Sequence, residues 1–460
     1  MSVFPKDILV HIAKFIPDDE LQNMLQVSSL FLDLALNVRY HEADFNRYRD
    51  YSKLLRKMEY PDLARRVRRV VVNPCNWAPL TIAEIRAAEY HKASQVIIDI
   101  VCKLTHVVEF YIDWRTSPSP QELEPFLKAA WATFGANLQV MSIIAPPDHI
   151  KGLQLAGCAT SSLREVYLSI GDAEGEDADK GTLETVLPFV SASSSTMRLL
   201  SISSRRRTLD LSDFFHSLPL FPELENIAIR IHLDKKSLSD ISSLSRLLQI
   251  HSSSLREVEL FPPYWRQSFL DDDMNGVINF LEVNLAKKAI LTNLHSLRLM
   301  VPAVPDHDEQ GIELVIPYVL RSATTLENLT LEGRFLKYVD FEKLVGASPY
   351  PALRHLFVKV DILTPKLMDL LAKRLLNLQR LHLDIFGSGG DANAGADSQH
   401  EGRCVENDNF EADMKKYDLR SWQLREIIVH YHAFIRMKQR EEARIKDLLI
   451  AAVPSLIGSP

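Results

Sequence analysis

The residues whose spacing most clearly indicates chemistry lie in the stretch DDDMNGVINFLE, residues 271–282. Asp271, Asp273, Asn275 and Glu282 occupy ligand positions of a twelve-residue calcium loop, and Gly276 stands at its sharp turn. Carboxylate and amide oxygens at these spacings suit a calcium ion. The pattern therefore predicts a calcium site, provided that a helix flanks it on each side.

The residues around this loop favour a different explanation. Pro262 and Pro263 leave only residues 264–270 for an entering helix, and the chain has no second loop of this pattern to pair with the first. An acidic loop that caps a helix from about Gly276 to Lys288 explains the same residues, because carboxylates stabilise a helix N-terminus. We expect no metal and no cofactor, with calcium binding by residues 271–282 as the alternative.

The Cys, His and basic residues elsewhere in the sequence do not have the spacing of a metal-binding or catalytic site. Cys102 and His106 could share one helix face, but no second ligand pair accompanies them, and His430 with His432 is an isolated pair. The basic runs at 65–69 and 205–207 are expected to be solvated surface, with nuclear-import or phosphate contacts as the alternative. The sequence has no dinucleotide, P-loop or serine-hydrolase motif. We therefore expect a binding protein and not an enzyme.

Composition narrows the kind of partner. The 460 residues are 46% hydrophobic and 25% charged, with a formal net charge of −7. A mildly acidic chain is a poor match to a phosphate backbone, so nucleic acid is not expected as a partner. No apolar run approaches a membrane span, and the first residues, MSVFPKDILVHIAKF, do not have the pattern of a secretory signal. The four cysteines form no disulfide or zinc pattern. We expect a protein of the cytoplasm, the nucleus or both.

The elements that must position any site are indicated by a repeat. A six-residue pattern, apolar at positions 1, 4 and 6, recurs at spacings of 25 to 46 residues, with helix-like stretches between. Weaker matches lie near Val67 to Val72 and Thr105 to Ile112. The ten clear copies begin at Leu138, Leu163, Met197, Leu224, Leu255, Leu294, Leu326, Leu353, Leu378 and Leu424.

A short strand followed by a helix cannot bury its apolar face alone, so successive units are expected to stack as a solenoid. A doubly wound sheet, with helices on both faces, also alternates strand and helix and stays as an alternative. The pattern resembles the LxxLxL segment of leucine-rich repeats. It departs from that family where an Asn should follow, at Gly171, Pro263, Arg334 and Phe386, so an irregular array is expected.

The first forty residues have a different pattern. Ile8, Leu9, Ile12, Phe15 and Ile16 recur at helical spacing, and Pro17 with two aspartates ends that helix and starts another. A second helix and a third, which contains Phe31, complete the segment. Three helices of this total length are too small for a self-sufficient core.

This segment resembles the F-box, and the chain resembles fungal-type F-box proteins with leucine-rich repeats. The resemblance covers about residues 3–40, with Phe4 in place of the usual Leu and Phe31 in place of the usual Trp. It implies binding to a Skp-type adaptor of a cullin–RING ubiquitin ligase, with the repeats presenting a protein substrate. A plain helical cap on a repeat scaffold with no ligase role is the alternative. The implied adaptor-binding residues are Phe4, Pro5, Ile8, Leu9, Ile12, Phe15, Ile16, Leu21, Val27 and Phe31.

Alternation along each strand assigns positions 3, 5 and 7 of the pattern to the face opposite the core. On this face an extended partner would bind, and the later strands collect cationic and histidine side chains. We expect an acidic or phosphorylated segment of the substrate there. The candidate substrate-binding residues are Tyr167, Phe261, His355, Phe357, Lys359, Arg380, His382 and His430.

The predicted fold is α/β, a three-helix F-box followed by an irregular leucine-rich-repeat solenoid of short parallel strands and convex helices. Residues 1–45 are assigned to the F-box, 46–66 to a helical linker and 67–435 to the solenoid. Residues 387–409 lack large apolar side chains and are expected to be disordered. Residues 436–460 are expected to form a capping helix and a tail.

Overall fold

A computed structural model of the chain divides into two compact units. The first comprises Met1–Leu209 with Ser217–Glu223, and the second comprises Asp210–His216 with Leu224–Pro460. The structure describes residues 5–24, 26–46, 51–77, 83–116, 118–155, 158, 161–171, 178–262, 276–285, 291–302, 310–386, 414, 416, 417, 419, 422–432, 443, 446, 447, 449–451, 453 and 456. Among them, no helix has the length and apolar character needed to cross a membrane.

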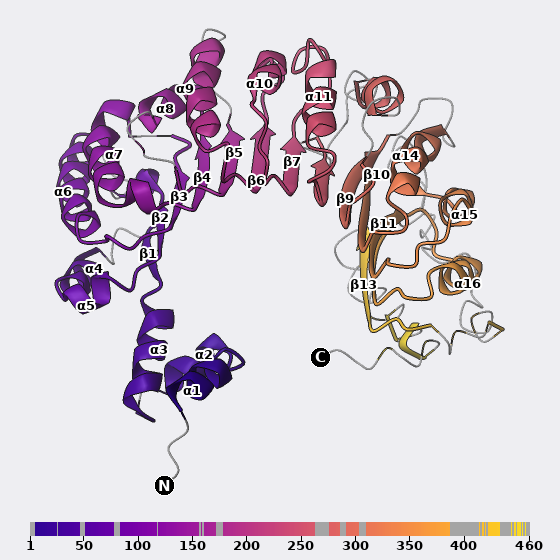
Figure 1. The fold of residues 1–460 in the computed structure, drawn as a ribbon, viewed down its shortest axis with the longest axis horizontal. Helices are drawn as coiled ribbons and strands as arrows, with labels where there is room; N and C mark the ends of the chain where they lie inside the picture. Colours follow the sequence, from indigo (N-terminus) through magenta and orange to yellow (C-terminus); the bar gives the residue numbers. More distant parts are fainter. Residues whose placement is uncertain are drawn as a thin grey trace, which may run out of the picture. The chain divides into compact units, whose positions relative to one another are not determined.

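Three short helices open the first unit (Figure 1): α1 (Lys6–Ala13), α2 (Asp18–Asn23) and α3 (Ser29–Arg39). Pro5 and Pro17 stand directly before α1 and α2, where a missing backbone N–H is no loss. Ser28 caps α3, since its side chain accepts a hydrogen bond of 3.3 Å from the N–H of Phe31. We refer to α1, α2 and α3 as the helical module.

Parallel strands follow, paired in chain order. In the first unit they are β1 (Glu42–Phe45), β2 (Arg69–Val72), β3 (Glu109–Asp113), β4 (Val140–Ala145), β5 (Glu165–Ile170) and β6 (Leu199–Ser204). The helical segments between them are α4 (Tyr51–Met58), α5 (Pro61–Ala64), η2 (Pro74–Asn76), α6 (Ala83–Val101), α7 (Pro120–Phe134), η3 (Gly135–Asn137), α8 (Pro147–Gly152) and α9 (Ala178–Ala192).

The second unit repeats this plan. Its strands are β7 (Asn226–Arg230), β8 (Glu257–Leu260), β9 (Ser296–Val301), β10 (Asn328–Leu336), β11 (His355–Val360), β12 (Arg380–Phe386) and β13 (Glu426–His432), again parallel and paired in chain order. Its helical segments are α10 (Ser212–Ser217), α11 (Ser242–Ile250), η5 (Phe280–Leu285), α14 (Gln310–Arg321), α15 (Tyr338–Gly346) and α16 (Pro365–Arg374).

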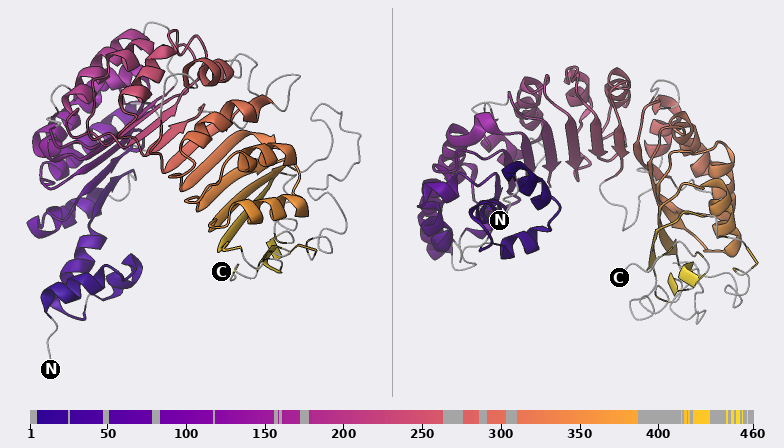
Figure 2. Two further views of the ribbon diagram at one scale, coloured as in Figure 1. Left: turned by 45° about the vertical axis from the view of Figure 1, so that its right-hand side comes forward. Right: turned by 60° about the horizontal axis from the view of Figure 1, so that its bottom comes forward.

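The ten copies of the six-residue pattern coincide with the ten strands β4 to β13, and the two weaker matches coincide with β2 and β3. Within each unit the helices lie on one side of the strands (Figure 2). A doubly wound sheet would cover both faces and reverse its strand order, so that alternative is wrong for each unit. The α/β prediction, with parallel strands in chain order as in a stacked repeat, is confirmed.

The strand array begins earlier than expected. β1 lies within residues 1–45, the range assigned to the F-box, and pairs with β2 from Glu42↔Arg69 to Phe45↔Val72. Ala43 and Phe45 are fully buried, because alternate side chains of this short strand enter the core of the array. The helical module therefore leads directly into the first strand, and α4 and α5 lie between β1 and β2.

One position without the repeat-family Asn is explained by a buried ion pair. Arg334, in the extended strand β10, contacts Asp340 of α15 at 2.7 Å, and both side chains are buried. Asp340 also accepts a hydrogen bond of 2.8 Å from the N–H of Lys337, which caps α15. The preceding Gly333 has a φ of 93°, and a Cβ there would lie 2.3 Å from the carbonyl oxygen of Val301. Glycine is required at this bend.

The predicted disordered loop, residues 387–409, lies outside the described residues. In the closing segment, residues 443, 446, 447 and 449–451 are helical, and Leu449, Val453 and Leu456 are buried.

Candidate functional site

The helical module has a small core of its own. Ala13, Leu21 and Phe31 are buried against one another, with partly buried apolar side chains around them. The surrounding residues are Leu9, Ile16, Met24, Leu34 and Val38. The adaptor-binding prediction is therefore corrected for Leu21 and Phe31, which face inward, and Leu9 and Ile16 present only part of their surface.

The side of α1 next to this core leaves large apolar side chains uncovered. Ile8 is 45% exposed, Ile12 is 44% exposed and Phe15, in the turn after the helix, is 77% exposed. Ile8 and Ile12 are four residues apart and share one helix face. Val27, before α3, is 62% exposed. We call Ile8, Ile12 and Phe15 the α1 apolar face; Pro5 is also exposed, and Phe4 lies outside the described residues.

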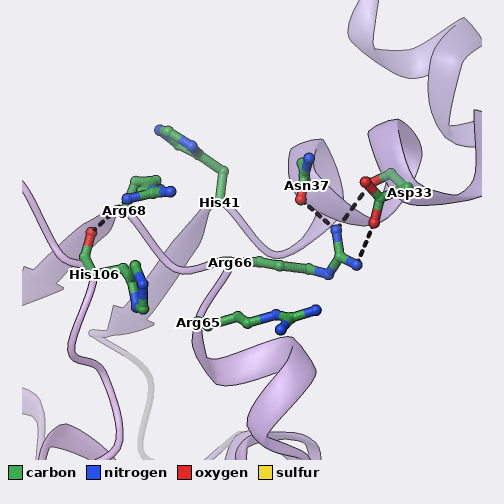
Figure 3. Close-up of a pocket in the computed structure, with 7 residues that line it drawn as sticks. All are labelled: Asp33, Asn37, His41, Arg65, Arg66, Arg68 and His106. Carbon is green, nitrogen blue, oxygen red and sulfur yellow. Dashed lines mark hydrogen bonds and ion pairs between the residues drawn. The ribbon is translucent and has the colours of Figure 1, made fainter. Parts of the chain in front are cut away.

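A polar contact joins the helical module to the strand array. Arg66, between α5 and β2, donates a hydrogen bond of 3.0 Å from Nη1 to the carbonyl oxygen of Asp33 in α3. Its guanidinium also contacts the Asp33 carboxylate and the side-chain oxygen of Asn37 (Figure 3). A cavity of about 360 Å³ lies beside this contact. Its lining residues are Asp33, Asn37, His41, Arg65, Arg66, Arg68 and His106.

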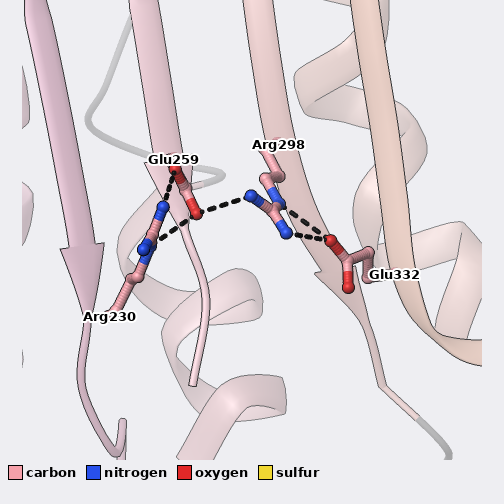
Figure 4. Close-up of polar contacts among 4 residues, drawn as sticks. All are labelled: Arg230, Glu259, Arg298 and Glu332. Carbon is pink, nitrogen blue, oxygen red and sulfur yellow. Dashed lines mark hydrogen bonds and ion pairs between the residues drawn. The ribbon is translucent and has the colours of Figure 1, made fainter. Parts of the chain in front are cut away.

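On the strand face of the second unit, β7 to β10 carry a chain of ion pairs (Figure 4). Arg230 of β7 contacts Glu259 of β8 at 2.8 Å through Nε, and Glu259 contacts Arg298 of β9 at 3.1 Å. Arg298 donates a further hydrogen bond of 2.8 Å from Nε to Glu332 of β10. We call these four residues the charge ladder; it neutralises its own charges across four neighbouring strands.

Phe261, predicted to meet a substrate beside these strands, is only 5% exposed. The Arg298 guanidinium carbon lies 5.1 Å from the centre of its ring. That prediction is corrected, because the ring lies in the core beneath the ladder and does not face a partner.

The next strands carry a cluster of aromatic and histidine side chains. The ring of His382 in β12 lies 4.3 Å from that of Phe357 in β11 and 4.7 Å from that of His430 in β13. Phe357 and His382 are half-buried, whereas His430 is exposed. Burial and the neighbouring His430 hold the pKa of His382 below its ordinary value, against the opposite effect of Asp384. We call Phe357, His382 and His430 the histidine cluster.

The cationic residues predicted around this cluster are less available than their sequence indicates. Lys359 is only 3% exposed and lies 5.4 Å from the ring centre of Phe335. Its prediction as a substrate contact is therefore corrected. Arg380 is exposed but contacts Glu426 at 2.9 Å. Burial and the nearby Arg380 lower the pKa of His355, which reduces its positive charge at neutral pH.

Tyr167 lies on β5 in the first unit, apart in sequence and in domain from the histidine cluster. Its hydroxyl donates a hydrogen bond of 2.9 Å to Glu165, and burial, with Glu165 beside it, raises its pKa. The predicted substrate residues therefore fall in both units, and the structure brings together only Phe357, His382 and His430 by ring contact.

The metal-ligand candidates gain no support. Among the described residues, no group of three or more His, Cys, Asp or Glu side chains could hold a metal ion. Residues 271–275 of the calcium-loop pattern lie outside the described residues, and Gly276 is helical. A Cβ at Gly276 would lie 2.2 Å from the carbonyl oxygen of Leu233, so close packing explains this glycine. Glu282 is exposed.

Two polar groups are not identified as sites by sequence spacing alone. The basic run at 65–69 predicts solvated surface, with nuclear-import or phosphate contacts as the alternative, whereas the structure places Arg65, Arg66 and Arg68 around a cavity lined by three separate segments. The charge ladder did leave a signal, because its members occupy positions 5 or 7 of consecutive repeats. Charges of alternating sign on the same face of neighbouring strands predict cross-strand pairs.

Comparison with known proteins identifies no family from sequence: no protein-family model and no curated protein matches the chain. Among solved structures, one described as the complex of Rad7 and Elc1 in yeast covers 86% of this chain and 91% of the matched chain, at 14% identity and a TM-score of 0.38. A likeness at this level carries no conclusion about what the present chain binds. The structure shows an α/β chain in which a helical module with an uncovered apolar face precedes parallel strands stacked in chain order.

Proposed function

We propose that this chain is a substrate-recognition subunit of a cullin–RING ubiquitin ligase of the Skp–cullin–F-box type. The helical module would bind the Skp-type adaptor, and the strand array would hold a protein substrate. The chain would perform no chemistry; it would raise the effective concentration of the substrate near the ubiquitin-conjugating enzyme. It would act in the cytoplasm, the nucleus or both.

The single observation that carries this proposal is the α1 apolar face. The module's own core uses Ala13, Leu21 and Phe31, so Ile12 and Phe15 are not needed to close it. An apolar helix side exposed beside a completed core fits a helix that docks in a hydrophobic groove of another protein. Few large side chains at the centre of such a contact supply most of its affinity.

The histidine cluster is the part of the array that best fits a substrate contact. Phe357, His382 and His430 offer ring surfaces on adjacent strands, whereas the charge ladder is already satisfied. Aromatic side chains are frequent anchors at protein interfaces. The structure reduces the case for a strongly acidic substrate segment, because Lys359 is buried and Arg380 is paired.

The test is adaptor binding by the full-length chain with Ile12→Asp and Phe15→Asp combined. We expect affinity for the purified Skp-type adaptor, measured by calorimetry, to fall about a hundredfold or more, because two desolvated anchors are lost. The matched control is Leu220→Asp with Leu376→Asp, which changes apolar side chains of 58% and 56% exposure outside the module. The control variant should bind as the unmodified chain does.

Two outcomes would contradict the proposal. The unmodified chain could show no affinity for the adaptor at micromolar concentration, which favours the repeat scaffold with no ligase role. Alternatively, the module variant and the control could bind equally well, which would place adaptor binding away from the α1 apolar face. Thermal unfolding of each variant separates a lost contact from a lost fold.

A further inference from the structure

The cavity beside the helical module is built mainly from basic side chains (Figure 3). Arg65, Arg66 and Arg68 come from the segment between α5 and β2, His41 from the turn after α3, and His106 from the turn before β3. Its volume of about 360 Å³ lies within the range of small-molecule sites. We call it the arginine pocket.

The charges that line the arginine pocket do not balance. Asp33 is its single carboxylate, and Arg66 already contacts it. The other two guanidinium groups therefore add positive charge with no carboxylate among the lining residues to offset it. An anion is favoured in such a site, and a cation or an apolar ligand is not.

Arg65 and Arg68 can turn toward a ligand at little cost. Arg65 contacts Asp62 at 3.2 Å, but the two side chains are 59% and 76% exposed, and ion pairs this exposed contribute little to stability. Arg68 donates one hydrogen bond of 3.2 Å from Nη1 to the carbonyl oxygen of His106, which leaves further donors of its guanidinium available.

Arg66 is held in place but not fully satisfied. Its Nη groups contact Asp33 and Asn37, while its buried Nε–H has no hydrogen-bond partner. A buried donor without an acceptor costs free energy. An anionic oxygen that reached it would supply the missing acceptor, and the bound contacts of Arg66 would keep the group in position.

We propose that the arginine pocket binds a small anion with phosphate groups. Guanidinium groups bind phosphate oxygens through paired N–H donors, and the two imidazoles can donate further hydrogen bonds. A bound anion would contact the turn after α3, the segment before β2 and the segment before β3 together. It would therefore stabilise the attachment of the helical module to the strand array. This inference does not depend on the proposed ligase role.

The experiment titrates pyrophosphate into the full-length chain by calorimetry and follows thermal unfolding in parallel. We expect saturable binding and a rise in the unfolding temperature of the unmodified chain. In the combined variant Arg65→Gln with Arg68→Gln, affinity should fall at least about tenfold. Arg66 is left unchanged, because it holds the module in place.

The matched control is Arg115→Gln with Arg198→Gln, two arginines of the same unit that also pair with a nearby carboxylate at the surface. The control should bind pyrophosphate as the unmodified chain does. Absence of binding at millimolar pyrophosphate would overturn the proposal, and so would an equal loss in the control, which indicates general charge attraction. Binding of a phosphoserine peptide but not of pyrophosphate would also overturn it, in favour of a macromolecular ligand.

Discussion

In the helical module, Ile8, Ile12 and Phe15 stay exposed beside a closed core, whereas on the face of β7 to β10 every ladder side chain contacts one of opposite charge. Both surfaces are rich in residues that form strong interactions. The module leaves apolar area in water, which costs free energy that a partner would recover. The charges of the ladder are already paired with one another.

The difference shows why residue type alone does not identify a binding surface. Arg298 and Phe261 would rank as interface anchors by type, but one is paired with two carboxylates and the other is buried. Phe15 is an ordinary apolar residue in sequence, yet it is 77% exposed. One prediction tests whether the ladder is self-sufficient, a second tests whether the module is not, and a third contrasts the histidine cluster with the ladder.

The largest effect is expected when the ladder is broken at Arg298. The substitution Arg298→Met leaves Glu332, whose side chain is 3% exposed, without its ionic partner. Because the Arg298 side chain is 36% exposed and only Glu332 is buried, we expect a loss of about 3 kcal/mol, the lower end of the range for a buried charge left unpaired. The free energy of unfolding of the second unit, measured by urea denaturation, should fall by that amount.

The exposed pair Arg380–Glu426 provides the control for the ladder. Its side chains are 64% and 36% exposed, so Arg380→Met should cost about 0–1 kcal/mol. Equal losses of unfolding free energy for Arg298→Met and Arg380→Met would show that the ladder stabilises the fold no more than an exposed ion pair does. The contrast between a self-sufficient ladder and an incomplete module would then be wrong.

Substitution of the two phenylalanines of the module should lower its stability to very different extents. Phe31→Ala removes a ring that is 8% exposed in a small core, and we expect a loss of about 3 kcal/mol. Phe15→Ala should change stability by less than about 0.5 kcal/mol, since that ring contributes little to the fold. Hydrogen exchange of the α3 amide groups reports the stability of the module directly. A larger loss for Phe15→Ala would mean that the α1 apolar face is structural.

The smallest expected effect is on the pH dependence of the free energy of unfolding. It tests the histidine cluster, whose His382 has a lowered pKa, and does not involve the ladder. Because folding lowers the pKa of His382, the unfolded chain binds more protons as the pH falls through about 6.5, and the free energy of unfolding decreases. His382→Phe should make this decrease shallower between pH 7.5 and 5.5, as measured by denaturation at each pH. His251 and His355, whose pKa values are also lowered, should preserve part of the slope.

A histidine of the other unit serves as the control for that measurement. His41→Phe, in the first unit, should leave the pH dependence of the second unit unchanged. A slope that is the same with and without His382 would show that its ring is not protected from protonation by the fold.

Most of the array was predictable from local pattern. The apolar triplets mark β4 to β13 because alternate side chains of each strand must enter the core, as in Val166, Leu168 and Ile170 of β5. β1 was missed, since its four residues carry only Ala43 and Phe45 as buried apolar side chains. The extension of β10 beyond its triplet was missed as well, because Gly333 and Arg334 act through a bend and an ion pair.

The sequence indicated which residues could belong to a site, but not which of their side chains are exposed. Helical spacing alone could not separate Ile12 from Phe31, since both are large apolar residues in short helices of the same module. Burial divides them, with Ile12 44% and Phe31 8% exposed. In the same way, position 7 of the repeat predicted Lys359 on the outer face, whereas packing against Phe335 buries it.

By itself the sequence determined the order and type of the elements, because hydrophobic periodicity and helix caps act over a few neighbouring residues. Only the tertiary structure decided which side chains are available, because exposure and charge pairing depend on residues that are about thirty positions apart, as Arg230 and Glu259 or Arg66 and Asp33 are. Side chains from separate segments must first be brought together before a charge is neutralised or an apolar face is left uncovered.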